Sequence, residues 1–280
     1  MSGFVLAVVL CGALLHATWN ALIRSGTDSF LSTVLVAAGA ALLSAAALPF
    51  VAQPAPASWP FIGASAATQL LYYILLAETY RAGDMSHSYP LMRGSAPLLV
   101  ALASAGVLHQ PLRLGQWLAI ACISGGILTM WAGTRRQGAP ARRTTTLALA
   151  TACSIAAFTL IDGAGVRRAG APAAYTMWIF LLTGAAYLAW CRHRRRGQLL
   201  AYARRHARIG VVGGAGTLGS YGLALWAMTQ APVATVAALR ETSILFATAI
   251  AALVLHERIS AQRYLAVALV GCGALAIRLV

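Results

Sequence analysis

The sequence predicts an all-α integral membrane protein with ten transmembrane helices in two inverted five-helix repeats. Hydrophobic residues make up 60% of the 280 positions and charged residues only 10%, whereas a soluble domain carries about 25% charged residues. The mean hydropathy is +0.75, and the apolar residues form runs long enough to cross a bilayer. One of these runs, with an arginine near its start, occurs twice.

The repeat is clearest in residues 237–259, AALRETSILFATAIAALVLHERI, an apolar run that contains an arginine and a glutamate. Ionisable groups inside a spanning run need a reason. A shift of 147 positions aligns this stretch without a gap with residues 90–112, PLMRGSAPLLVALASAGVLHQPL. The shift places Arg93 on Arg240, Ser95 on Thr242, His109 on His256 and Leu112 on Ile259.

The ten predicted helices are apolar runs separated by charged or Pro-containing breaks. Each run is near the ~20 residues that a helix needs to span a ~30 Å hydrocarbon core. Most breaks are short, so consecutive helices are expected to be antiparallel neighbours. Five helices is an odd number, so the second copy starts from the opposite side of the membrane, as in many secondary transporters. The runs are 4–23, 30–51, 59–80, 86–108, 113–133, 145–165, 173–191, 209–230, 233–255 and 260–279.

Two breaks, 134–144 and 192–208, are longer than the rest. The first divides the chain into the two predicted repeats, residues 1–134 and residues 144–280. The run at 4–23 has no basic segment before it and no clean cleavage site after it, so we interpret it as the first span and not as a signal peptide.

The basic residues predict the orientation of the chain. All 21 are arginine, and the net charge is +15. Short loops rich in positive charge face the cytoplasm. Fifteen arginines follow the first, third, fifth, seventh and ninth runs, against four on the other side, so both termini are predicted outside. This orientation depends on the number of spans, because losing the Ala-rich run 30–51 or 173–191 would invert everything after it.

Several other classes of protein are disfavoured. The positive charge lies in short gaps between spans, so it does not indicate a nucleic-acid partner. The five cysteines lie in or beside apolar runs without metal-ligand spacing, so we expect no metal and no disulfide framework. The GAGTLG at 214–219 matches a dinucleotide fingerprint but lies inside a spanning run, so no nucleotide cofactor is expected. It belongs to a stripe of glycines between Gly210 and Gly222 that lets a neighbouring backbone approach closely.

The stretch ALRETSILFATAIAALVLHERISAQRYLAVALVGCGALAI resembles the last two helices of the EamA family, within the drug/metabolite transporter (DMT) superfamily. The features that carry the resemblance are the Arg-Glu pair followed by small polar residues, the LHERIS corner and the Gly-rich last helix. LLHATWNALIR at 14–24 is similar to the first helix of that family. With both repeats, the resemblance covers essentially the whole chain.

The resemblance implies a multi-pass transporter of the bacterial inner (cytoplasmic) membrane that exports small metabolites, often amino acids, in exchange for protons. It does not settle the substrate. Many members have cytoplasmic termini, and the arginine distribution of this chain departs from that pattern. Import or facilitated exchange stays open at this point.

Charged residues inside the spans are the main candidates for a site. Arg240 and Glu241 are adjacent and point about 100° apart, so they cannot face each other. Arg93, at the matching place in the first repeat, is expected to pair with Glu241, because symmetry-related helices meet near the midplane. In one interpretation the arginines bind an anionic or zwitterionic substrate, with Glu241 as counter-charge or proton carrier. In the other, a buried ion pair only ties the repeats together.

Asp162 is a further candidate, and it matches Asn20 on a shift of 142. It either binds a cation or proton or, being five residues before Arg167 near the end of its run, caps the helix at the interface. His16 and His87 titrate in the useful range and either relay protons or are packing residues.

Two other acids are expected to be structural. Glu78 is expected to form a surface pair with Arg81, three residues later. Glu257 is expected to be a cap or corner residue.

Aromatic residues in the runs suit the walls of a cavity for a small amphipathic molecule, although packing residues would give the same pattern. The tyrosines in question are Tyr72, Tyr73, Tyr89 and Tyr221. Trp19, Trp178 and Trp226 lie deep in their runs, whereas Trp59, Trp117, Trp131 and Trp190 fall near run ends, as in an interfacial belt.

Pro90 and Pro97 free backbone carbonyls in run 86–108, which makes that helix the candidate gating element. The sequence thus predicts a secondary transporter with a small-molecule substrate, and the family resemblance implies that protons are the coupling ion. No P-loop is present, so gradients must supply the energy. An intramembrane enzyme would need a catalytic constellation such as GxSxG, which is absent. A non-transporting receptor is the other alternative. A chain that contains both repeats need not dimerise, so a monomer is favoured.

Overall fold

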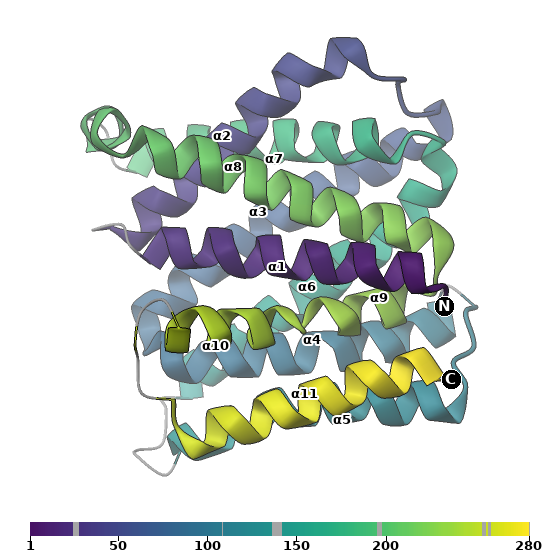
Figure 1. Cartoon of the computed structure of the whole chain (residues 1–280). Coiled ribbons are helices and arrows are strands. Elements are labelled where there is room, and N and C mark those ends of the chain that lie inside the picture. The colour runs from purple at the N-terminus through teal and green to yellow at the C-terminus, as the bar shows by residue number, and fades with distance from the viewer. Residues whose placement is uncertain are drawn as a thin grey trace.

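The computed structural model describes residues 1–24, 28–107, 109–135, 142–194, 198–253, 256 and 259–279, and this part of the chain is all-helical apart from its connections. It contains ten helical segments long and apolar enough to cross a membrane. The spans run along a common direction, and both termini lie at the same end of the bundle (Figure 1). The predicted fold class is confirmed.

Every predicted run contains a helix. The first repeat has α1 (Gly3–Arg24), α2 (Ser29–Ala47), α3 (Trp59–Ala82), α4 (Met85–Val107) and α5 (Leu114–Arg135), with short 3-10 turns at Leu48–Phe50 and Pro56–Ser58 between α2 and α3. The second repeat has α6 (Arg142–Ala169), α7 (Pro172–Arg194), α8 (Gln198–Gln230), α9 (Val233–Arg240), α10 (Ser243–Leu253) and α11 (Ala261–Leu279).

The predicted connection at 192–208 is in large part helical. Helix α8 begins at Gln198 and is kinked at His206, where φ is −122° and ψ is 27°. The Tyr202 hydroxyl group contacts Ser32 Oγ at 2.8 Å and donates to the carbonyl group of Asp28. This first part of α8 is therefore attached to the start of α2.

The ninth span is broken in its middle, and it comprises α9 and α10. Glu241 and Thr242 separate the two helices as a turn in which the Thr242 amide donates to Leu239 O at 3.0 Å and the Ile244 amide to Glu241 O at 3.0 Å. The Thr242 hydroxyl group also donates to Leu239 O. The freed backbone groups are thus satisfied inside the protein, as an irregular backbone at membrane depth requires.

Helix α4, the candidate gating element, is not interrupted at its two prolines. Helix α4 is continuous through Pro90 and Pro97. A proline removes one backbone donor, and neighbouring groups can compensate for that loss without a change of helix. The interruption lies instead in the symmetry-related span, at its only carboxylate, Glu241.

The contact between α5 and α11 follows the predicted two-fold relation closely. Cys122 Sγ lies 3.3 Å from Leu269 O, a residue 147 positions away. Gly126 and Gly273 are also 147 positions apart, and a side chain on either would clash across this contact. A Cβ on Gly126 would lie 3.1 Å from Ala266 O, and one on Gly273 would lie 2.8 Å from Ala119 O. The two carbonyl groups are themselves 147 positions apart.

The same relation holds at the ends of α4 and α10. His109 and His256 both adopt the left-handed backbone conformation, with φ values of 51° and 52°. Few non-glycine residues do so, and no other non-glycine residue that the structure describes has a positive φ. The alignment of 90–112 with 237–259 therefore corresponds to a repeated corner of the backbone.

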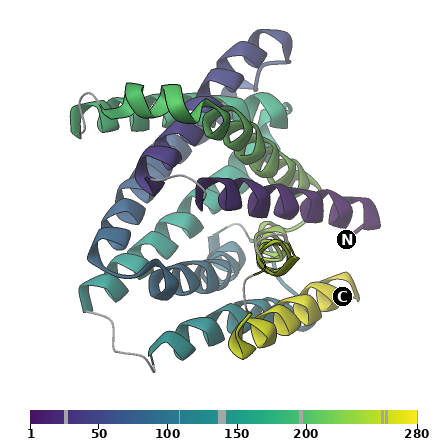
Figure 2. The same ribbon diagram turned by 60° about the vertical axis from the view of Figure 1, so that its left-hand side comes forward.

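The halves interdigitate. Helix α3 packs against α6 and α1 against α8, a pair of contacts that the two-fold relation interchanges, while α2 packs against both α7 and α8. Figure 2 shows the ninth span nearly end-on, surrounded by α1, α4 and the α5–α11 pair. We propose that 1–134 and 144–280 are the repeating units, although neither half is a separate compact body.

The first part of the glycine stripe on α8 packs against α2 and allows the predicted close approach of a neighbouring backbone. A Cβ on Gly214 would lie 2.6 Å from the Ala40 nitrogen, and one on Gly213 would lie 2.5 Å from Val36 Cγ2. Gly39 on α2 lies against the backbone of Gly210. These small residues let the two helices approach at backbone distance.

Replacing Gly126 with Ala should destabilise the α5–α11 contact. The new Cβ would lie 2.8 Å from Leu269 Cβ, and such overpacking costs about 1–3 kcal/mol. Its neighbour Gly125 is the matched control, because a Cβ there meets nothing within 4 Å and alanine favours the helix. We expect a lower melting temperature in detergent for Gly126→Ala and no decrease for Gly125→Ala. Equal melting temperatures would contradict the helix contact described here.

Candidate functional site

A cavity of about 1070 Å³ extends from the middle of the bundle to the arginine-rich end of the spans. Arg93, Tyr221 and Arg240 line its deep part, and Arg81 and Arg263 line its outer part. The Arg81 side chain is 73% exposed. The cavity therefore begins at the end of the bundle opposite the termini and ends near the break in the ninth span.

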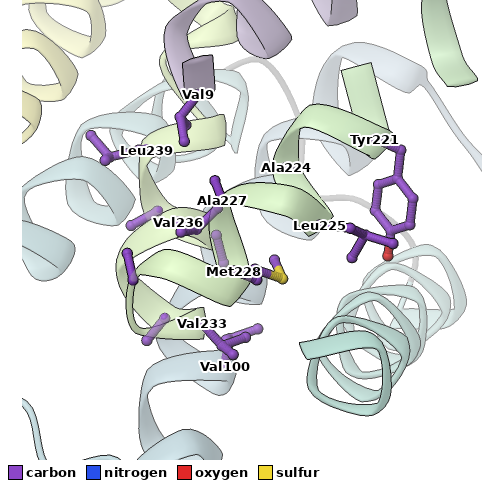
Figure 3. Close-up of a cluster of buried hydrophobic side chains, with 14 of the residues drawn as sticks. Val9, Val100, Tyr221, Ala224, Leu225, Ala227, Met228, Val233, Val236 and Leu239 are labelled. Carbon is purple, nitrogen blue, oxygen red and sulfur yellow. The ribbon is translucent and has the colours of Figure 1, made fainter. Parts of the chain in front are cut away.

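The other end of the bundle is closed by packed apolar side chains. Figure 3 shows the cluster, in which Val233, Val236 and Leu239 of α9 lie beside Val9, Val100 and Met228. The three α9 residues are completely buried. Residues 233–239 are all buried, whereas most of α10 is only partly buried or exposed. The broken span thus has one half in the closed end and one half along the cavity.

Most of the predicted site residues meet at this cavity. Two do not line it: Glu241 lies behind Arg93, and Asp162 lies behind Tyr221. The predicted residues that line it are His16, Trp19, Asn20, Tyr72, Tyr73, Tyr89, Arg93, Tyr221 and Arg240.

The ion pair predicted across the repeats is present. Arg93 Nη2 lies 2.9 Å from Glu241 Oε1, and the two side chains are 15% and 7% exposed. The contact joins α4 to the turn between α9 and α10. A buried charge must be paired because desolvation is costly, and this pair neutralises one of the two arginines.

The second arginine has no such partner. Among the residues that the structure describes, no carboxylate oxygen lies within 4.0 Å of the Arg240 guanidinium group. Its Cζ lies over the Tyr221 ring, 4.8 Å from the ring centroid, in a cation–π contact. Arg240 therefore presents a positive charge to the deep part of the cavity.

Asp162 is fully buried, which rules out the interfacial cap. Its carboxylate accepts hydrogen bonds from the Tyr221 hydroxyl group at 2.5 Å, the Tyr175 hydroxyl group at 3.1 Å and Gln69 Nε2 at 3.4 Å. Helix α6 extends to Ala169, four residues beyond the predicted run, so Asp162 lies deeper than expected. Arg167 caps another helix: it donates to the carbonyl groups at the end of α8 and directly after it.

Stacked aromatic rings form one wall of the cavity. Tyr73 stacks on Tyr187 with 4.6 Å between centroids, and Tyr187 stacks on Trp190 at 5.7 Å. Trp190 thus lines the cavity and is not only an interfacial residue. Sequence reasoning missed Tyr187, although it lies one helical turn before Trp190. It also missed Gln69, Phe158, Phe180, Ser220 and Ser243.

Of the other predicted aromatic and histidine candidates, some line the cavity and others pack elsewhere in the bundle. Of the three deep tryptophans, only Trp19 lines the cavity, with its ring 5.1 Å from that of His16. Trp178 donates to Gln53, and Trp226 packs edge-on against Phe4. His87 accepts a hydrogen bond from Trp131 away from the cavity.

The remaining acids have structural environments where they are described. Glu78 forms the expected pair with Arg81 at 3.0 Å. Glu257 lies outside the described residues. Within the described residues, no three His, Cys, Asp or Glu side chains are grouped as metal ligands.

The comparison with known families agrees with this architecture. Residues 143–279 match the model of the EamA-like transporter family. This half of the chain belongs to the EamA-like transporter family. Members of this family are membrane transporters and generally not enzymes. Family membership therefore implies a small-molecule substrate. No curated protein matches the sequence.

A solved structure resembles both halves of the chain. One crystal structure of a protein is similar over 100% of this chain and 98% of its own, with a TM-score of 0.78 and 19% sequence identity. At that identity the likeness shows the fold alone. The ten candidate spans and this full-length likeness agree with the predicted fold class.

Replacing Glu241 with Gln should strongly destabilise the protein, because it leaves Arg93 buried without a counter-charge. Removing one partner of a buried ion pair costs about 3–5 kcal/mol. Glu78→Gln is the matched control, because its pair with Arg81 is exposed and should contribute less than ~1 kcal/mol. Unfolding in mixed detergent–SDS micelles measures both changes.

The double variant Arg93→Met/Glu241→Gln should recover part of the loss, since no unpaired charge is left. A Glu241→Gln effect as small as that of Glu78→Gln would show that the pair does not hold the repeats together.

Proposed function

We propose that this EamA-like transporter exports a small, amino-acid-like metabolite across the bacterial inner membrane by alternating access, with proton coupling. The observation that carries the proposal is Arg240, a cation without a carboxylate partner among the described residues, at the deep end of a cavity. An anionic group of the substrate would complete this charge. A carboxylate suits a guanidinium group because it can accept two parallel hydrogen bonds.

The walls of the cavity support an amphipathic substrate. Tyr72, Tyr73, Tyr187 and Trp190 offer apolar ring faces with polar edges, which suit a small molecule with one apolar and one polar part. Asn20 and Gln69 add hydrogen-bonding groups to the lining. These features favour a carboxylate with an apolar side chain over a sugar or an inorganic ion.

The broken span supports alternating access. The cavity reaches one end of the bundle, and the cluster around α9 closes the other. For the site to open to the other side, α9 must leave Val9, Val100 and Met228, and the turn at Glu241 and Thr242 is the natural hinge. Discontinuous helices at a central site are typical of secondary transporters.

The charged residues supply a scheme for coupling. Arg93 and Arg240 lie near one substrate site, and Glu241 is bound to Arg93. During the cycle, Glu241 would exchange partners between the arginines and carry the coupling proton. Export would then be driven by proton entry, and one chain would suffice because it contains both repeats.

Replacing Arg240 with Gln should reduce counterflow of the substrate about tenfold or more, since a hydrogen bond to a charged group contributes about 1.5–3 kcal/mol. Proteoliposomes would be tested with labelled amino acids and their amides, with and without a pH gradient. Arg168→Gln is the control, because Arg168 also stacks on a ring, Phe61 at 4.9 Å, but lies outside the cavity.

The two arginine variants separate loss of the site from loss of folding. If Arg240→Gln transports carboxylates as well as Arg168→Gln does, Arg240 does not bind the substrate. Flux that does not respond to a pH gradient would overturn proton coupling, and uptake driven by an inward proton gradient would reverse the proposed direction.

The orientation can be checked by cysteine labelling in a variant without the five native cysteines. We propose that the arginine-rich end is cytoplasmic. Leu200, 63% exposed, lies at that end, and Phe50, 87% exposed, lies between α2 and α3 at the other end. Leu200→Cys should react with an impermeant maleimide only in inside-out vesicles, and Phe50→Cys only in intact spheroplasts. The opposite pattern would place the termini in the cytoplasm.

A further inference from the structure

Asp162 is buried behind the cavity wall and belongs to a network from four helices. Its two oxygens accept from Tyr221 on α8, Tyr175 on α7 and Gln69 on α3. Gln69 in turn donates to Ser65. All of these partners are neutral, and no cation lies within 4.0 Å of the carboxylate among the described residues. Asp162 does not line the cavity, so it does not touch a substrate there.

The network reaches the cavity through Gln69 and through Tyr221, which also contacts Arg240. One end of the Tyr221 side chain, the hydroxyl group, is held by Asp162, and its ring face carries the Arg240 guanidinium group. The ring is also held at its sides, since Phe180 packs edge-on at 5.8 Å and Phe158 at 6.3 Å. Because the hydroxyl group is fixed as well, the ring cannot shift along the line from its Cβ to its hydroxyl group.

We propose that Asp162 is a positioning residue, which holds Tyr221 as the platform that directs Arg240 toward the carboxylate of the substrate. The inference rests on the proposed function, in which Arg240 binds that carboxylate. Two physical effects carry it. A phenol that donates to a carboxylate is polarised, which makes the ring a better partner for a cation. A guanidinium group held in one orientation also loses less entropy when the carboxylate binds.

Tyr175 provides a matched control for Tyr221. Both tyrosines are buried, and each donates one hydrogen bond to Asp162. Only Tyr221 carries Arg240 and lines the cavity. A purely structural role of the network predicts similar effects from Tyr221→Phe and Tyr175→Phe. The positioning role predicts similar losses of stability but different effects on binding.

The experiment measures binding of 3-phenylpropionate and of its uncharged amide by isothermal titration to the detergent-solubilised full chain. The wild type should bind the carboxylate more tightly than the amide, and Arg240→Gln should abolish that preference. Tyr221→Phe should weaken carboxylate binding about fivefold more than it weakens amide binding, which corresponds to the loss of one hydrogen bond. Tyr175→Phe should change neither Kd by more than about twofold. Melting temperatures report the structural cost of each variant.

The outcomes separate this inference from the proposed function. If the wild type does not prefer the carboxylate, or if Arg240→Gln keeps the preference, carboxylate recognition by Arg240 is wrong, and the positioning role is wrong with it. If Arg240→Gln removes the preference but Tyr221→Phe and Tyr175→Phe have equal effects, only the positioning role is overturned. Asp162→Asn adds a direct test. The NH2 group of an Asn side chain cannot accept a hydrogen bond, so Asn cannot accept from all three donors as Asp162 does. This variant should resemble Tyr221→Phe in its carboxylate preference.

Discussion

The ion pair between Arg93 and Glu241 is the contact on which the rest of the site depends. In a low-dielectric interior an unpaired charge is costly, and a pair is tolerated only with good geometry. Each repeat supplies one of the charges, so the cost is offset only when α4 and the ninth span meet. The requirement therefore acts on the assembly of the two repeats and not on either repeat alone.

The asymmetry of the two repeats makes this pair compatible with a binding site. The shift of 147 places Glu241 on Gly94, so the chain has two matching arginines and one glutamate between them. A side chain at Gly94 would have little room, since its Cβ would lie 2.8 Å from Leu128 Cγ. The position in α4 thus serves packing against α5, whereas the position after α9 holds the counter-charge. Arg240 is left to the cavity as a consequence.

Much of this arrangement could be predicted from the sequence, for physical reasons. Hydrophobic length located every span, because a spanning helix has little choice of length. Arg93 and Glu241 located the meeting point of the repeats, since opposite charges at similar depth in oil need one another. The left-handed backbone at both His109 and His256 shows that the repeat extends to local conformation.

Other features depend on tertiary contacts that the sequence pattern does not contain. The break at Glu241 and Thr242 occurs in an apolar run without glycine or proline, whereas α4 continues through two prolines. Asp162 seemed near an interface because the apolar run ends at 165, but the helix continues to Ala169. Its environment comes from α3, α7 and α8, and no local pattern near Asp162 indicates those partners. In this protein, the neighbouring helices determine whether a helix continues or breaks and how deeply a residue such as Asp162 is buried.

In the proposed transport cycle, the position of the break would let the two halves of the ninth span move separately. Upstream of it, α9 is buried among α1, α4 and α8 at the closed end; downstream, α10 lies along the cavity. An unbroken helix would transmit any tilt of one half to the other, so opening one end would distort the packing at both. The turn removes that link, while Arg93 holds it in place through Glu241. Glu241 therefore lies in the break between α9 and α10 and also anchors it through the ion pair with Arg93.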